Sequence, residues 1–220
     1  MENASNPDLS LWKQGLRTVP DHVWDRAGLR TLVLADNELT ELSERVGELR
    51  ALRMLDLGHN RLRRIPDSLG ELPDLSDFLY LHDNALTELP ASLGRLARLR
   101  YLNISENEFD ILPDAVTNMS GLIELRVTDN RLTALPDSIS KLARLRELHL
   151  RNNRLTSLPP TVGAMAQLRQ IDLRGNPITS LPETLQGLAR LEKLDLRWVT
   201  TLSHPDWFTE LEARGCVIYL

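Results

Sequence analysis

Histidine and cysteine are the residues of this chain best suited to nucleophilic or metal-ion chemistry, and they are few. His59 and His82 come from adjacent units and could approach each other, but no cysteine accompanies them as a metal ligand. The sequence has no glycine-rich phosphate loop and no nucleophile elbow. Paired carboxylates occur, but an open sheet lacks the desolvated pocket that would tune them. We therefore predict a non-catalytic protein with no metal site and no cofactor.

A phrase of the form Leu-x-x-Leu-x-Leu-x-x-Asn-x-Leu recurs along most of the chain. Its copies at Leu122, Leu145 and Leu168 start 23 residues apart, a period typical of a leucine-rich repeat solenoid. The alternating apolar residues predict a short strand with one buried face. The asparagine should turn inward and bond backbone groups. The resulting ladder would contain Asn37, Asn60, Asn84, Asn107, Asn130, Asn153 and Asn176.

The second half of each unit reads Leu-Pro-x-x-Leu-x-x-Leu and predicts a short helical or 3-10 turn behind the strand. Proline suits the start of such a turn because its φ is fixed and its missing N–H is harmless there. The second unit has Ser43 instead, which predicts a looser turn. Stacked units give an α/β solenoid, a curved leucine-rich repeat horseshoe with a parallel concave sheet and short helical or 3-10 convex segments.

We expect one domain in three parts. Residues 1–28 form an N-terminal cap with a degenerate repeat, residues 29–202 form eight leucine-rich repeats, and residues 203–220 form a C-terminal cap. In the last part Ser203 is expected to cap a helix that Gly215 ends, followed by a closing strand. Caps of this kind blunt the open ends of the sheet.

The fourth unit contains one extra residue, because Leu75 to Asn84 is nine steps where Leu52 to Asn60 is eight. The extra residue falls within residues 76–80 and predicts a bulge before the strand. Bulges often re-aim side chains at functional surfaces. The alternative is an insertion that a loop tolerates without any role.

The formal net charge is −5 with both signs interspersed, which gives no case for nucleic acid or membrane as a partner. We find no signal peptide and no run of eighteen apolar residues. A lone cysteine, Cys216, cannot form an internal disulfide and favours a reducing compartment. We therefore expect a cytoplasmic monomer. The preference for arginine over lysine favours a bacterial source.

The 23-residue unit resembles the short intracellular class of leucine-rich repeats, which includes Ras-pathway scaffolds and many bacterial proteins. The resemblance covers roughly residues 6–202. It implies protein–protein recognition through the concave face, as in a signalling scaffold, and no chemistry of its own. The alternative is a substrate-recognition subunit or bacterial effector acting with a separately encoded ligase, kinase or phosphatase.

Outward strand positions form columns down the stack, with neighbours about 4.8 Å apart. One cluster in these columns is apolar and aromatic, as interface hot spots are. This aromatic patch contains Val33, Met54, Phe78, Tyr80 and Tyr101. The alternative is that the insertion turns Phe78 inward in place of Leu79 and that the tyrosines only decorate the sheet.

A second cluster, the arginine patch, contains Arg126, His149, Arg151, Arg174 and Arg197. Asp172 and Asp195 are placed to pair these cations across adjacent strands. The alternative to such structural pairing is the docking of an acidic partner on the arginines. The residues before several ladder asparagines form an acidic rim, which we expect to be solvated rather than to bind Ca²⁺: Asp36, Asp83, Glu106 and Asp129.

Overall fold

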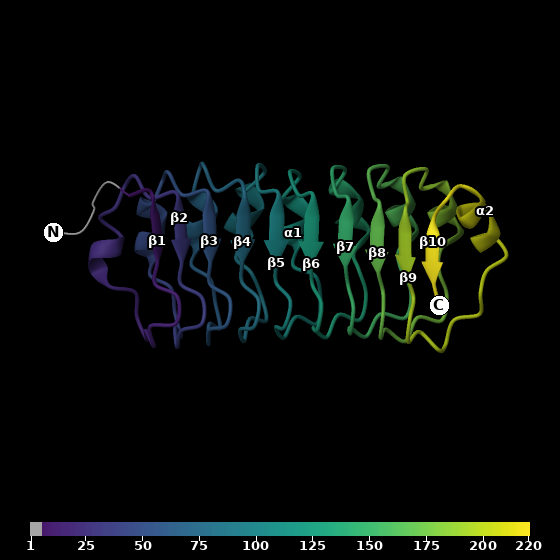
Figure 1. The fold of residues 1–220 in the computed structure, drawn as a ribbon, viewed down its shortest axis with the longest axis horizontal. Coiled ribbons are helices and arrows are strands. Elements are labelled where there is room, and N and C mark those ends of the chain that lie inside the picture. Colours follow the sequence, from purple (N-terminus) through teal and green to yellow (C-terminus); the bar gives the residue numbers. More distant parts are fainter. Residues whose placement is uncertain (1–5) are drawn as a thin grey trace.

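The computed structural model describes residues 6–220, so the first five residues of the predicted cap at 1–28 lie outside it. Ten parallel strands stand side by side in one sheet, in the order of the chain (Figure 1). The predicted solenoid is confirmed. The strands are β1 (Asp8–Ser10), β2 (Thr31–Val33), β3 (Met54–Asp56), β4 (Phe78–Tyr80), β5 (Tyr101–Asn103), β6 (Glu124–Arg126), β7 (Glu147–His149), β8 (Gln170–Asp172), β9 (Lys193–Asp195) and β10 (Val217–Tyr219).

Short helical turns cover the other side of the sheet, as the spacing of three between apolar residues predicts. Most are 3-10 turns that begin directly after a proline. No helix of residues 6–220 is both long and apolar enough to cross a membrane. The turns are η1 (Asp21–Val23), η2 (Glu44–Glu48), η3 (Asp67–Glu71), η4 (Ala91–Arg95), α1 (Asp114–Asn118), η5 (Asp137–Lys141), η6 (Pro160–Ala164), η7 (Glu183–Gly187) and α2 (Phe208–Ala213).

The turn of the second unit has its own capping interaction in place of a proline. The Ser43 side chain accepts a hydrogen bond from the backbone N–H of Arg45 at 3.2 Å. The cap satisfies a donor that a helical start leaves free. η2 is consequently as long as η3 and η4, and the prediction of a looser turn is wrong.

The extra residue of the fourth unit lies before β4 and leaves the strand register intact. Phe78 stands opposite Met54 on one side and Tyr101 on the other. Leu79 is fully buried, whereas Phe78 is 43% exposed. The insertion therefore does not turn Phe78 inward. The irregularity is at Ser76, whose carbonyl accepts the bond from the N–H of Arg100 that the residue directly before the strand accepts in other units.

The C-terminal segment closes the sheet with a strand, as predicted, but its helix begins later than predicted. α2 begins at Phe208 after Trp207, which makes no side-chain capping bond, so the expected cap at Ser203 is wrong. Gly215 follows the helix with a φ of 91°, a conformation that favours glycine. β10 then pairs in parallel with β9.

One apolar core runs the length of the solenoid between the sheet and the turns, and leucine supplies most of it. Where the helical turns of neighbouring units touch, their backbones approach each other closely. A methyl group on Gly70 of η3 would lie 2.3 Å from the backbone carbonyl of Ser92 in η4. Glycine at this position therefore sets how closely the two units approach.

Gly70→Ala should lower the free energy of unfolding by about 1–3 kcal/mol, because the added methyl pushes η3 away from η4. Gly187→Ala in η7 is the matched control, since nothing lies within 4 Å of its added Cβ. That control should be neutral or slightly stabilising, because alanine reduces the freedom of the unfolded chain. Urea unfolding would measure both, and equal effects would contradict the close contact.

Candidate protein-binding face

Buried asparagines join each repeat to the one before it. The Asn130 amide donates to the carbonyl of Ile104 at 3.0 Å, and its Oδ1 accepts from the N–H of Phe109 at 3.1 Å. Both partners belong to the preceding unit. Equivalent bonds occur at all seven predicted ladder positions. Six of the seven are buried, and Asn84 beside the lengthened unit is half-buried.

The residue before each ladder asparagine adopts a left-handed backbone. These residues are Asp36, His59, Asp83, Glu106, Asp129, Asn152 and Gly175, with φ between 50° and 68°. Aspartate and asparagine tolerate this conformation better than most side chains. The acidic rim thus occupies turn positions, which accounts for its composition without a bound cation.

The structure brings the rings of the aromatic patch together on β4 and β5. The ring centroid of Tyr101 lies 5.5 Å from that of Phe78 and 5.0 Å from that of Tyr80. Met54 is the direct neighbour of Phe78 in the sheet. Val33 is not joined to the rings, because Asp56 stands between it and Tyr80 in the register.

A hollow of about 210 Å³ opens beside the rings of Phe78 and Tyr101. Ile123 completes its apolar lining, and the charged side chains of Arg100 and Glu124 also border it. An apolar floor with charges around it is the usual composition of a protein-binding hot spot. The hollow is suited to one apolar side chain of a partner.

Burial shifts the ionisation of the two tyrosines. It raises the pKa of Tyr101 to about 12, although the nearby Arg126 guanidinium acts in the opposite direction. Burial also raises the pKa of Tyr80. Both phenols are therefore protonated near neutral pH and can donate hydrogen bonds.

Most of the arginine patch is neutralised, and its shortest contacts lie within one repeat unit rather than between neighbouring units. Arg174 Nη2 lies 2.6 Å from Asp172, and Arg197 Nη2 lies 2.8 Å from Asp195. The contact between strands, from Arg174 to Asp195, is longer at 3.6 Å. The predicted cross-strand pairing is thus wrong for the short contacts. Burial raises the pKa of Asp195, but the bond from Arg197 and the charge of Arg174 outweigh it, so this pKa is lowered.

Arg151 differs from the other arginines of its column. Among the residues that the structure describes, no carboxylate pairs with it, and its Nε is buried without a hydrogen-bond partner. Its guanidinium lies 5.9 Å from the ring centre of Trp198, and that of Arg174 lies 5.8 Å from the same ring. Trp198 is 65% exposed. The sequence patterns missed Trp198, which follows β9 where the ladder motif has broken down.

The other members of the arginine patch form a mixed cluster on β6 and β7. Arg126 Nε is 2.6 Å from Glu124, and His149 Nε2 is 3.3 Å from Glu147 and 3.7 Å from Glu124. The two glutamates and His149 offer ligand atoms within 4.8 Å of one another, a grouping that the sequence reasoning did not single out. A cation there would meet the positive charge of Arg126. We therefore assign these residues to the charge network of the face.

The two histidines singled out in the sequence do approach each other. Their ring centroids are 4.8 Å apart, and His59 Nδ1 lies 2.5 Å from Asp83. The His82 ring packs over Gly58, where an added Cβ would come within 2.2 Å of it. Burial lowers the pKa of His82, and His59 adds to this effect. The pair is a packed contact at the edge of the sheet.

Comparison with known families identifies the repeats. Residues 8–62, 27–86, 109–155 and 143–198 match one leucine-rich repeat model, and residues 98–119 match another. The chain belongs to the leucine-rich repeat family. None of the curated protein sequences compared with it matches.

Solved structures of leucine-rich repeat proteins are similar over nearly the whole chain. The Leptospira interrogans protein LIC12759 is 25% identical with a TM-score of 0.76, and the alignment covers 98% of this chain and 66% of that protein. The repeat domain of the type III effector XopL is 26% identical with a TM-score of 0.82, covering 98% and 76%. The plant receptor RGFR1, in complex with the peptide hormone RGF2, is 30% identical with a TM-score of 0.77, covering 95% and 34%. The chain thus spans about a third of that receptor and just under two thirds of the Leptospira protein.

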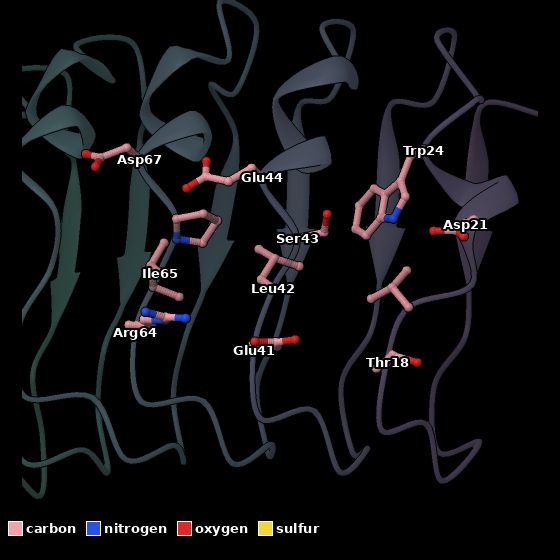
Figure 2. Close-up of a pocket in the computed structure, with 12 residues that line it drawn as sticks. Thr18, Asp21, Trp24, Glu41, Leu42, Ser43, Glu44, Arg64, Ile65 and Asp67 are labelled. Carbon is pink, nitrogen blue, oxygen red and sulfur yellow. The ribbon is translucent and has the colours of Figure 1, made fainter.

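The leucine-rich repeat solenoid also has a hollow of about 550 Å³ away from the sheet, where the chain enters η1, η2 and η3. Its carboxylates come from Asp21, Glu41, Glu44 and Asp67. Figure 2 shows them spread over successive turns rather than aimed at one point. Glu44 is already engaged, because its carboxylate accepts a bond from the N–H of Ser68. The hollow therefore has no convergent set of groups.

Asn130→Ala should lower the free energy of unfolding by about 1–3 kcal/mol, because it leaves buried backbone groups of the preceding unit without partners. Asn118→Ala makes the same chemical change at an exposed position and should stay within about 0.5 kcal/mol. Denaturant unfolding would compare them. A small effect at both positions would mean that the ladder contributes little to stability.

Tyr101→Phe should remove the phenol that ionises near pH 12. The folded-state pKa lies above the unfolded value of about 10, so the stability from this group is complete below pH 10 and is lost as the pH rises to about 12. Ultraviolet absorbance titration of the folded protein would follow the phenols, with Tyr80→Phe as the control that retains the component near 12. A component near pH 12 that persists in Tyr101→Phe would contradict the assignment of that pKa to Tyr101.

Proposed function

We propose that this chain is a non-catalytic interaction module that binds a protein partner through the concave face of its sheet. The observation that carries the proposal is the aromatic patch on β4 and β5. Phe78 is 43% exposed there, although only 5% of the residues in the chain are aromatic. Large rings gathered on an exposed surface are typical of partner-binding sites.

The geometry of the aromatic patch supports a role in docking a partner. The rings of Phe78, Tyr80 and Tyr101 pack on one another, which limits the side-chain freedom that a partner must remove on binding. The hollow beside them offers a place for an anchoring side chain. The complex of the similar receptor RGFR1 with a peptide hormone supports the use of such repeats for peptide or protein recognition.

The proposal extends to the setting of the interaction. The chain acts as a monomer in the cytoplasm, with protein rather than nucleic acid or membrane as its partner. The single Cys216 is buried beside the last strand and is suited to a reducing compartment. Interspersed charges and a net charge of −5 support a protein partner over a polyanion.

The similarity to the repeat domain of the effector XopL favours a second candidate function. In that case the chain recognises substrates or host proteins for a separately encoded ligase, kinase or phosphatase. Both functions use the same face. They differ in whether an enzyme co-purifies with the wild-type chain and remains bound when the concave face is altered.

Phe78→Ala combined with Tyr101→Ala should weaken partner capture by about thirtyfold or more, because hot-spot truncations cost about 2 kcal/mol or more. The melting temperature should change little, since the rings lie on the surface of the sheet. Affinity capture from the native cell, mass spectrometry and titration of the recovered protein would measure the effect.

Ile111→Ala is the matched control, because Ile111 is 65% exposed and lies outside the sheet. Its capture should equal that of the wild type. Unchanged capture by the double variant would remove the aromatic patch as the binding site. A large fall in its melting temperature would show that the rings serve the fold.

A further inference from the structure

Within residues 6–220, Arg151 on the concave face has no carboxylate partner, and a hollow of about 230 Å³ opens in front of it. Arg126, His149, Arg151, Arg174 and Lys193 line this hollow from successive strands, with Asp172 as its acidic member. Asp172 is occupied, because both its oxygens accept bonds from Arg174. Arg151 is the member whose charge the described part of the chain leaves uncompensated.

Arg151 is held in place although it has no salt bridge. Trp198 lies against its guanidinium and against that of Arg174, with distances of 5.9 and 5.8 Å to the ring centre. A cation over an indole face is stabilised without losing its hydrogen-bond donors. Asp172 fixes Arg174 from the other side. The guanidinium of Arg151 is thus oriented in advance for a planar anion.

The formal charges around the hollow indicate how much negative charge that anion carries. The cations are Arg126, Arg151, Arg174, Lys193 and Arg197, and the carboxylates are Glu124, Glu147, Asp172 and Asp195. These formal charges, in which histidine is counted as neutral, leave one positive charge over. A carboxylate carries one negative charge, whereas a phosphoryl group carries about 1.5 to 2 at neutral pH. The balance favours a carboxylate.

We propose that this hollow binds the carboxylate of an acidic side chain in a peptide segment of the partner, with Arg151 as the residue that determines specificity. The inference rests on the proposed concave-face function. Arg151 forms the direct ion pair, and Trp198 and Asp172 position the cationic groups. An arginine that is already oriented loses less side-chain freedom on pairing with a carboxylate than a flexible arginine does.

The aromatic patch limits where the acidic residue lies in the peptide. The hollow beside Phe78 and Tyr101 is centred near β5, and the arginine hollow lies near β7 and β8. Two to three strand spacings, about 10–14 Å, separate them across the sheet, and Arg151 beyond the end of β7 is also offset along the strands from Phe78 and Tyr101 at strand starts. Extended residues four or six apart point to the same side and span about 13 or 20 Å. The peptide therefore crosses the strands obliquely, with an apolar and an acidic side chain about four to six residues apart.

A phage-displayed library of random dodecapeptides tests this arrangement, with the wild-type chain, Arg151→Gln and Arg144→Gln as baits. Arg144 is an exposed arginine at the end of the preceding unit, outside the sheet and the hollow. Wild type and Arg144→Gln should enrich aspartate or glutamate about four to six residues from an aromatic or aliphatic residue. Arg151→Gln should enrich the apolar residue alone. Thermal melts should show all three baits equally folded.

Fluorescence anisotropy with the most enriched peptide gives the magnitude. Arg151→Gln should weaken binding about tenfold or more, as should the peptide with its acidic residue changed to the amide. The two changes together should cost little more than either alone, because they remove the same pair. Arg151→Lys should recover only part of the affinity, since lysine retains the charge without the planar fork.

Three results would overturn the proposal. The acidic preference could persist with Arg151→Gln, a phosphoserine peptide could bind more tightly than the acidic one, or amidation of the peptide C-terminus could abolish binding. Peptides that need Phe78 and Tyr101 but ignore Arg151 would retain the concave-face function and reject the carboxylate site. A library that yields no binder to the wild type would reject both.

Discussion

The buried asparagine amide is the interaction on which the rest of this structure depends. A short strand must end in a turn whose backbone groups are removed from water, and each such group needs a partner. The Asn130 side chain meets this need by bonding Ile104 and Phe109 of the preceding unit. Repetition of this bond holds successive turns in step and so holds the strands in register.

This constraint leaves the outward side chains free to vary. Every strand of the described residues spans three residues, of which the middle one lies in the core or packs against it and the flanking two face outward. Substitution at an outward position barely affects the stack, because neither the core leucine nor the ladder asparagine is involved. Repeats of nearly identical interior can therefore present rings on β4 and β5 and charges on β6 to β9. Function in such a fold is determined by surface composition rather than by the fold.

Ion pairing on the concave face shows how local geometry limits which charged groups remain available to a partner. An arginine two residues after the aspartate that ends a strand reaches it directly, as Arg174 reaches Asp172 and Arg197 reaches Asp195. Arg151 has His149 at the equivalent place and so has no carboxylate of its own. Its cation is instead held against Trp198, which keeps its donors available. The residue two positions before each arginine thus decides whether that arginine forms a structural ion pair or remains a candidate recognition group.

The sequence by itself determined the solenoid, the parallel register and the outward columns, because a strict 23-residue repeat with alternating leucines has one way to bury them all. It left open whether Phe78 or Leu79 enters the core, because an inserted residue can shift the alternation either way. The tertiary structure decided this through the neighbouring strands, whose register places Leu79 between Leu55 and Leu102. The tertiary structure also decided that Ser43 caps η2, that α2 starts only at Phe208, that arginines pair with aspartates of their own unit, and that Trp198 lies against Arg151. Each of these features depends on contacts between side chains whose relative positions no local sequence pattern specifies.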